Sequence, residues 1–267
     1  MKVIDSPIKK ELLVSLDYFH GFCEKNNLTY YLLGGTLIGA VRHKGFIPWD
    51  DDIDVGMPRK DYDRLLSLRH KVTGKFDLKH YSGDSNYIYP YIKLCNNGLI
   101  VQESFFQPFS CGVWIDIFPL DYTCRNRVFT HGIYRAIKAL RVALIIRNGA
   151  FKEEKRSALA NAMLRFLSKV SRVLPNRVLF ALSDVLGRLG KNDKEYINYH
   201  GAWGIKESGP VNILSDRILV RFEGKEFYTF KNYDWWLTKV YGDYMALPPE
   251  SQRFSEHYIV KKENAKN

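Results

Sequence analysis

The stretch that decides the fold spans residues 34–66, GGTLIGAVRHKGFIPWDDDIDVGMPRKDYDRLL, and it places four carboxylates within five positions: Asp50, Asp51, Asp52 and Asp54. Carboxylates this close repel one another unless water, a cation or basic side chains neutralise them. The last two alternate with Ile53 and Val55. On a strand over residues 52–57, this alternation would direct both carboxylates to one face and the apolar pair to the core. We therefore expect a rigid carboxylate pair suited to a hard cation.

The segments on either side of this cluster suit a phosphate. An expected buried strand over residues 28–35 ends in the turn Gly34-Gly35, and a short helix over residues 36–43 leaves that turn. Backbone N–H groups at such a turn, together with a helix N-terminus, favour phosphate binding. A later apolar strand, residues 112–121, carries the carboxylate of Asp116. A glycine turn with three strand carboxylates is typical of metal-assisted phosphoryl or nucleotidyl transfer.

Two other interpretations explain the acidic cluster less well. A solvated acidic turn does not account for the alternation with apolar residues. A calcium loop would use Asp50, Asp52 and Asp54 at its first, third and fifth positions. However, Val55 occupies the position that needs glycine, and Asp61 occupies the position that needs glutamate.

Hydrophobic periodicity predicts the remaining elements. Helices are expected over residues 7–26, from Pro58 onward, and over 233–244. Strands are expected over 87–96, over 98–104 beyond an Asn-Asn-Gly turn, and over a hairpin at 217–230 that turns at Glu223-Gly224. Residues 126–191 should form two or three basic amphipathic helices, interrupted near Asn148-Gly149 and Pro175.

The charge of the chain is concentrated in one segment. The net charge is +11, and residues 125–191 contain 15 of the 40 Lys and Arg residues but three of the 29 Asp and Glu residues. Basic amphipathic helices suit an anionic membrane surface, although a helical subdomain with a solvated basic face has the same pattern. A nucleic-acid-binding module would also explain the charge, but unmetallated carboxylates would repel its ligand, so no nucleic acid is expected.

No segment has the apolar length of a signal peptide or of a membrane span. We therefore expect a cytoplasmic protein, with peripheral contact at the inner face of the cell membrane through residues 125–191.

The order of these motifs resembles the nucleotidyltransferase fold of polymerase-beta-like enzymes. More narrowly, residues 34–66, GVWIDIFPLD at 112–121 and YGDYMALPPESQR at 241–253 resemble the LicD family of bacterial phosphocholine transferases. Fukutin and fukutin-related protein, which transfer ribitol phosphate, are distant relatives of that family. The resemblance implies an α+β fold, a mixed sheet core with flanking helices and a basic helical insertion. Its parts would be residues 1–124 as the catalytic core, 125–200 as the basic helical subdomain, and 201–267 as the hairpin and helix that complete the catalytic domain.

The resemblance also implies roles for individual residues. Asp52 and Asp54, supported by Asp50, would hold Mg²⁺ or Mn²⁺, and Asp116 would complete the metal site or accept the proton of the acceptor hydroxyl. Donor phosphates would contact Gly34, Gly35, Thr36, Arg42, Lys44 and Lys93. The last of these interrupts an apolar strand, and a buried lysine needs an anionic partner. The substrate pocket would include His43, Tyr241, Asp243 and Arg253.

The family resemblance favours phosphocholine transfer from CDP-choline to a glycan or lipid-linked glycan precursor of lipopolysaccharide, teichoic acid or capsule. Other nucleotide donors would instead supply glycerol, ribitol or sugar phosphate. A quaternary ammonium favours an aromatic cage. The candidates for such a cage are Tyr87, Tyr89, Tyr91, Trp235 and Trp236.

Overall fold

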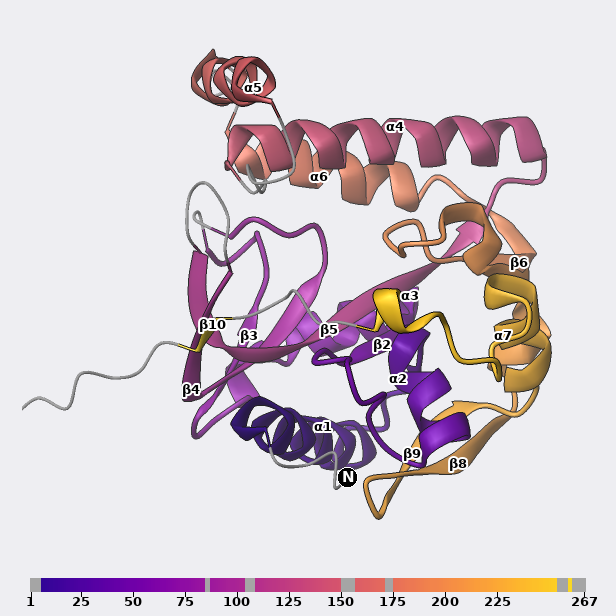
Figure 1. Ribbon diagram of the computed structural model, residues 1–267. Coiled ribbons are helices and arrows are strands. Elements are labelled where there is room, and N and C mark those ends of the chain that lie inside the picture. The colour runs from indigo at the N-terminus through magenta and orange to yellow at the C-terminus, as the bar shows by residue number, and fades with distance from the viewer. Residues whose placement is uncertain are drawn as a thin grey trace, which may run out of the picture.

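The computed structural model describes residues 6–84, 87–103, 109–149, 157–170, 175–253 and 259–260. A mixed sheet with the strand order β1-β2-β5-β4-β10 lies at its centre (Figure 1). The strands of this sheet and its extensions are β1 (Tyr31–Leu32), β2 (Asp54–Pro58), β3 (Phe76–Lys79), β4 (Ile92–Glu103), β5 (Phe109–Thr123), β6 (Asn192–Ile197), β7 (Ser208–Pro210) and β10 (Ile259–Val260). β2 and β5 run parallel, whereas the other pairs are antiparallel.

Helices surround the sheet on both faces. The α-helices are α1 (Pro7–Lys25), α2 (Gly34–Ile38), α3 (Arg59–Ser67), α4 (Arg127–Arg147), α5 (Ala158–Val170), α6 (Asn176–Gly187) and α7 (Tyr233–Tyr241). A π-helix, η2 (Gly39–His43), continues α2, and the 3₁₀ turns are η3 (Arg69–Lys71), η5 (Gly204–Glu207), η6 (Val211–Leu214) and η7 (Glu250–Gln252). A separate hairpin consists of β8 (Arg217–Phe222) and β9 (Lys225–Phe230).

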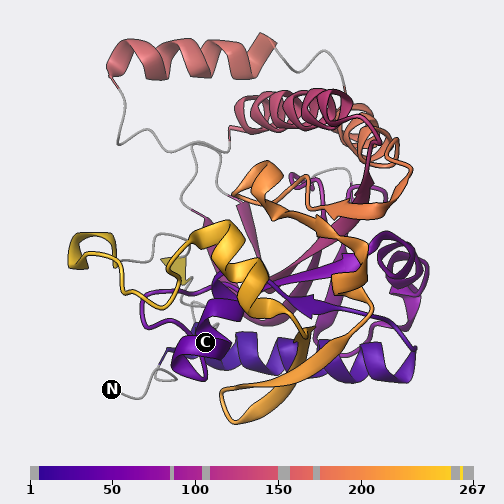
Figure 2. The same cartoon turned by 90° about the vertical axis from the view of Figure 1, so that its right-hand side faces the viewer.

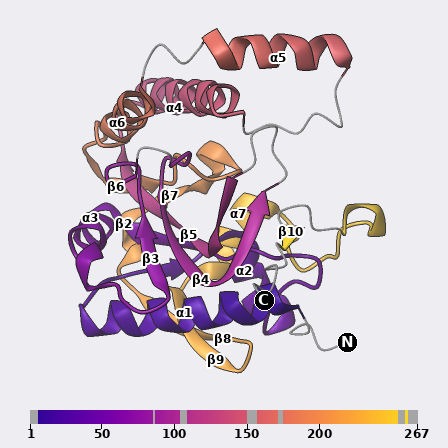
Figure 3. The same ribbon diagram turned by 90° about the vertical axis from the view of Figure 1, so that its left-hand side faces the viewer.

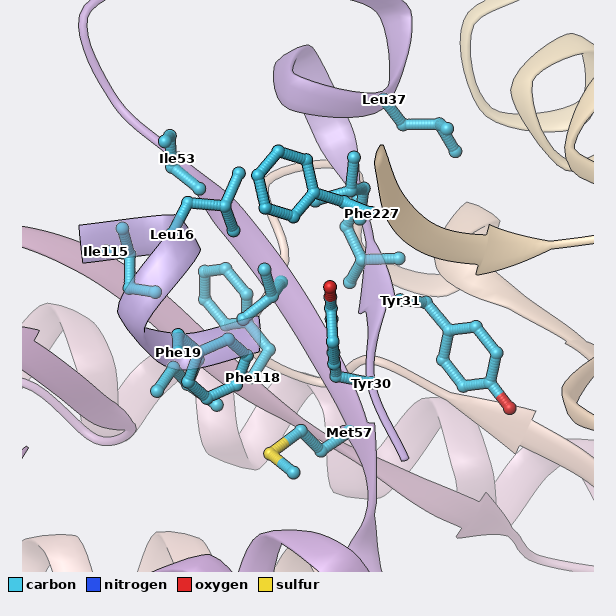
Figure 4. Close-up of a cluster of buried hydrophobic side chains, with 14 of the residues drawn as sticks. Leu16, Phe19, Tyr30, Tyr31, Leu37, Ile53, Met57, Ile115, Phe118 and Phe227 are labelled. Atoms are coloured by element: carbon cyan, nitrogen blue, oxygen red, sulfur yellow. The ribbon is translucent and has the colours of Figure 1, made fainter. Parts of the chain in front are cut away.

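The core lies mainly between α1 and one face of the sheet. Leu12, Leu16 and Phe19 follow the three- and four-residue spacing of one helix face, and all three are buried. Figure 4 shows Leu16 and Phe19 together with Ile115 of β5 in this cluster. Burial of this apolar face fixes which side of the sheet turns toward α1. Alternate residues of β2 and β5 must then point to the opposite face.

The opposite side of the molecule carries a layer of helices. α4 and α6 run side by side, and α5 lies farther from the sheet than either of them (Figures 1 and 3). Ile133 and Ile137 of α4 form a small second cluster with Ile197 and Tyr199. Within the described residues, no helix combines the length and apolar character needed to span a membrane.

Several expected elements are confirmed, including α1 and the hairpin. The hairpin turns at Glu223 and Gly224, which both have positive φ angles. The expected basic region forms α4, α5 and α6, although residues 150–156 and 171–174 of it lie outside the described residues.

Three strand predictions were wrong in their bounds. The Asn-Asn-Gly segment does not separate two strands, because β4 continues through it with a register shift between Asn96 and Ile100. This bulge lets β4 stay paired with β5, whereas a reverse turn would have ended the pairing. Residues 87–91 precede β4 and are not part of it, and the expected strand over 28–35 is reduced to Tyr31–Leu32. Ser104, the last residue of the other expected strand, lies outside the described residues.

Candidate active site

Three charged side chains form a row across the sheet. Asp54 of β2 is the register partner of Asp116 in β5, and Asp116 is in turn the register partner of Lys93 in β4. Register partners in a sheet project from the same face. All three line a cavity of about 420 Å³, which Asp52 also lines. The carboxylates expected to act together are therefore brought together at one cavity.

Lys93 and Asp116, which both line this cavity, form an ion pair. Lys93 Nζ donates a hydrogen bond to Asp116 Oδ1 at 2.5 Å, and the Tyr91 hydroxyl lies 3.4 Å from Asp116 Oδ2. The Lys93 ammonium also lies 3.9 Å from the ring centre of Tyr89 and 4.1 Å from that of Trp114. Asp116 is thus the anion that balances the buried lysine. A contact between Lys93 and a donor phosphate stays a prediction.

The backbone at Asp52 differs from the expected strand. β2 begins at Asp54, so Asp52 belongs to the preceding loop and not to a strand. Parallel pairing with β5 starts at Asp54 and Asp116, and this sets the start of β2. The alternation argument was therefore wrong for Asp52, although its side chain still lines the same cavity as Asp54.

The Asp54 carboxylate is in an environment that disfavours a negative charge. Burial raises its pKa well above the ordinary range, and the neighbouring charges of Asp52, Asp116 and Asp50 add to this effect. Burial also raises the pKa of Asp116, while Lys93 opposes that shift. Among the described residues, no hydrogen-bond donor contacts the carboxylate of Asp52 or Asp54. A bound cation would neutralise both carboxylates.

Two of the carboxylates lie close to the backbone of Gly34 and Gly35. Gly34 has a φ of +55°, and a Cβ atom there would lie 2.8 Å from Asp54 Oδ2. A Cβ atom at Gly35 would overlap Asp50 Oδ2. The backbone N–H of Asp54 donates to Thr36 Oγ1 at 2.9 Å. The turn thus fixes the start of β2 and leaves space for the carboxylates of Asp50 and Asp54. Gly34 is the residue of this turn that lines the cavity.

The donor set fits a hard divalent cation. Asp50, Asp52 and Asp54 offer oxygen ligands, which Mg²⁺ and Mn²⁺ prefer. Within the described chain, no three His, Cys, Asp or Glu side chains converge as a complete ligand set. Mg²⁺ commonly binds through one or two carboxylates, with substrate phosphates and water completing its shell. The residues present therefore fit a cation that is shared with a phosphorylated substrate.

The predicted basic loop does not line the cavity. Arg42 Nη1 donates to the carbonyls of Tyr244 at 2.7 Å and Ala246 at 3.0 Å, and its Nε donates to His43 Nε2 at 2.9 Å. Lys44 is exposed, with a left-handed backbone. In this structure Arg42 therefore joins η2 to the C-terminal segment 241–253.

Of the C-terminal residues predicted for the substrate pocket, Tyr241 lines the cavity. Asp243 Oδ1 instead accepts from the backbone N–H of Ala246 at 3.2 Å, and Arg253 Nε donates to the carbonyl of Pro248 at 2.8 Å. Tyr89 and Tyr91 also line the cavity, whereas Trp236 is buried in the core and Trp235 is partly exposed on α7.

The wall of the cavity formed by residues 198–207 was missed by sequence reasoning. Glu207 is buried there and accepts hydrogen bonds from the Trp203 backbone N–H and from Asn198 Nδ2, both at 2.8 Å. Burial raises the pKa of Glu207 to about 7. His200 Nδ1 is buried without a hydrogen-bond partner among the described residues, and burial lowers the pKa of His200 to about 3. No sequence motif indicates this segment, because its residues reach the cavity only through the pairing of β6 and β7 in the folded chain.

Comparison with known proteins identifies the family. Residues 27–135 match the family described as "LicD/FKTN/FKRP, nucleotidyltransferase domain". The chain is also 30% identical over 254 residues to the lipopolysaccharide cholinephosphotransferase LicD of Haemophilus influenzae, covering 91% of each protein. The chain belongs to the LicD family. It is therefore a phosphotransferase of the LicD type.

Two further similarities concern shorter segments. The ribitol 5-phosphate transferase FKRP of Homo sapiens is 40% identical over 57 residues, which is 21% of this chain and 12% of FKRP. An uncharacterised protein of Rickettsia prowazekii, RP689, is 52% identical over 49 residues, or 18% of each chain.

Proposed function

We propose that this LicD-family protein transfers phosphocholine from CDP-choline to a hydroxyl group of a cell-surface glycan precursor. The acceptor oxygen forms a bond to the phosphorus of phosphocholine, the bond to CMP breaks, and the acceptor proton leaves. The observation that carries this proposal is the row of Lys93, Asp116 and Asp54 facing one cavity with Asp52. The extent of similarity to a cholinephosphotransferase supports the choice of donor. We also assign the sheet to the nucleotidyltransferase type, on the parallel β2–β5 pair and its carboxylates.

We assign Mg²⁺ or Mn²⁺ to Asp52 and Asp54, with Asp50 in support. When bound, the cation would neutralise the donor pyrophosphate and the charge that develops on CMP. The raised pKa of Asp54 supports this assignment, because adjacent buried carboxylates need a counter-charge to stay ionised.

The aromatic residues of the cavity suit the choline group. A quaternary ammonium is attracted to aromatic faces. Tyr89 and Trp114 already contact the ammonium of Lys93. Trp203 and Tyr241 line the same cavity, and their ring centres lie 5.2 Å apart. We therefore assign the choline contact to Trp203 and Tyr241.

We assign removal of the acceptor proton to Glu207. Asp116 is tied to Lys93, which holds it as a paired carboxylate. Glu207 lines the same cavity, and its two hydrogen bonds come from neutral groups. A carboxylate with a pKa of about 7 is well matched to proton transfer near neutral pH.

The experiment that tests the function compares donors directly. Purified protein is incubated with Mg²⁺, a glycan acceptor and one of CDP-choline, CDP-glycerol or CDP-ribitol, and the products are identified by mass spectrometry. We expect phosphocholine transfer with release of CMP, abolished by EDTA and restored by Mg²⁺. Turnover of CDP-ribitol alone would assign the alternative that the FKRP similarity favours. Turnover that persists in EDTA would contradict the metal assignment.

A further inference from the structure

Helix α5 presents its apolar face away from the protein. Leu159, Met163 and Phe166 follow three- and four-residue spacing, and their exposed fractions are 82%, 58% and 64%. On the opposite side of the helix, Ser168 is 1% exposed, and its hydroxyl donates to the carbonyl of Arg147 in α4 at 3.1 Å. A surface helix ordinarily buries its apolar stripe and exposes its polar side. In α5 this arrangement is reversed.

Helix α6 shows the same arrangement. Its exposed apolar residues recur along one stripe, with exposed fractions between 47% and 54%: Val178, Leu182, Val185 and, just beyond the helix, Leu189. Phe180 and Ser183 lie on the other side of the helix and are buried. Both helices therefore expose an apolar stripe, and exposed apolar surface of this kind marks contact with an apolar environment.

Basic residues accompany these stripes. Arg165 and Lys169 are exposed on α5, and Arg135 and Lys138 are exposed on α4. Across α4, α5 and α6 there is a single acidic residue, Asp184, which pairs with Arg59 and Arg188. The helical layer therefore combines exposed apolar side chains with an excess of basic over acidic residues. This combination is typical of helices that lie in the headgroup region of anionic bilayers.

A second copy of the chain is a weaker candidate for this surface. Two copies that met through this layer would bring two strongly basic segments together, and the like charges would oppose association. An anionic surface would instead attract them. We propose that α5 docks in the plane of an anionic bilayer. Leu159, Met163 and Phe166 enter the boundary between headgroups and acyl chains, while Arg165 and Lys169 contact lipid phosphates.

The placement of α4 connects this surface with the cavity. Leu144 and Ile145 of α4 line the cavity, and the carbonyl of the nearby Arg147 accepts the hydrogen bond from α5. Figure 2 shows α5 standing outside α4, which separates it from the sheet. A docked bilayer would thus lie one helix away from the active site. This location suits an acceptor that is carried on a lipid, although the docking proposal does not depend on the donor or acceptor.

Vesicle flotation of the full chain tests the proposal. We expect the protein to float with vesicles of mixed phosphatidylglycerol and phosphatidylcholine. Binding to pure phosphatidylcholine vesicles, or binding in about 0.5 M salt, should be roughly tenfold weaker. The double variant Leu159→Ser with Phe166→Ser should bind anionic vesicles at least about tenfold more weakly. The double variant Arg165→Gln with Lys169→Gln should lose a similar factor.

Matched variants separate docking from general surface effects. Val14→Ser with Leu219→Ser removes two apolar side chains that are 43% and 45% exposed elsewhere on the surface. Lys25→Gln with Lys60→Gln removes two exposed charges outside the helical layer. Both controls should retain wild-type binding, and all variants should keep the wild-type melting temperature within about 3 °C.

Two results would overturn the docking of α5. One is a wild-type chain that does not bind anionic vesicles, and the other is an α5 variant that binds as well as the wild type. If the wild-type protein does not bind vesicles but self-associates, and the α5 variant no longer self-associates, the surface contacts a second copy of the chain. Flotation requires no turnover, so its failure is distinguishable from failure of the proposed transferase activity.

Discussion

At Asp54, burial and four neighbouring carboxylates all disfavour the charged side chain. Replacement by asparagine keeps the shape of the side chain and removes that charge. We expect Asp54→Asn to lower kcat by roughly 100-fold or more, because the counter-charge for the donor phosphates would be held less tightly. The melting temperature should stay the same or rise, because electrostatic repulsion is relieved. Steady-state kinetics and thermal unfolding measure the two effects.

Asp51 provides the matched control for this prediction. It belongs to the same acidic run but does not line the cavity, and its charge acts on Lys9. Asp51→Asn should therefore retain most of the activity. A fully active Asp54→Asn protein would refute the role assigned to Asp54.

The raised pKa of Glu207 predicts that the stability of the protein depends on pH. Its folded pKa of about 7 lies above its ordinary value of 4.5, so the folded state holds a proton that the unfolded state has released. Its contribution to stability is therefore present below about pH 4.5 and is lost as the pH rises toward 7. Glu207→Gln cannot lose a proton. Relative to the wild type, this variant should gain about 3 kcal/mol of unfolding free energy between pH 4.5 and pH 8.

Urea unfolding across this pH range measures the difference between the two proteins. Asp54 and Asp116 also have raised pKa values, but they are present in both proteins and their effects cancel in the comparison. A difference that does not change with pH would show that Glu207 titrates normally in the folded protein.

Among the structural elements, the first turn of α2 depends on having no side chains at its two glycine positions. Alanine at Gly35 would push the Asp50 carboxylate away, and alanine at Gly34 would also occupy a left-handed conformation. We expect Gly35→Ala to lower kcat about tenfold because a positioned carboxylate shifts. Gly34→Ala should in addition cost about 1–2 kcal/mol of stability. Kinetics and urea unfolding separate these effects.

Gly21 provides the comparison within α1. A Cβ atom there would meet nothing within 4 Å. Gly21→Ala should be active and more stable by about 0.5–1 kcal/mol, because alanine favours the helix. Equal effects of alanine at Gly21 and Gly35 would remove the argument for close approach at the turn.

Across the whole molecule, one arginine ties the helical layer to the sheet. Arg59 of α3 donates two hydrogen bonds to Asp121 of β5, at 2.6 and 2.8 Å, and one to Asp184 of α6 at 2.8 Å. Asp121 is buried. Arg59→Met would leave that carboxylate without its partner, so we expect a loss of about 3–5 kcal/mol of unfolding free energy.

Arg188 gives a control of the same chemistry at the surface. It pairs with Asp63 at 2.7 Å and with Asp184 at 2.8 Å, but its side chain is 40% exposed. Because water screens exposed pairs, Arg188→Met should cost about 1 kcal/mol or less. Equal losses for Arg59→Met and Arg188→Met in urea unfolding would contradict the distinction between buried and exposed pairs.

The sequence by itself determined the family, most of the helices, the hairpin and the acidic cluster. These features depend on local periodicity, turn residues and a contiguous motif, all of which can be read from neighbours along the chain. The alternation of carboxylates with apolar residues led to Asp54 correctly, whereas Asp52 proved to precede the strand.

Only the tertiary structure decided which distant groups share the cavity. Lys93, Asp116 and Asp54 meet through the registers of β2, β5 and β4, and Glu207 joins them from a segment without any motif. Arg42 was predicted to bind phosphate and instead bonds the carbonyls of Tyr244 and Ala246. The physical reason is that strand register and the direction of a side chain depend on packing between segments far apart in the chain, which periodicity does not encode.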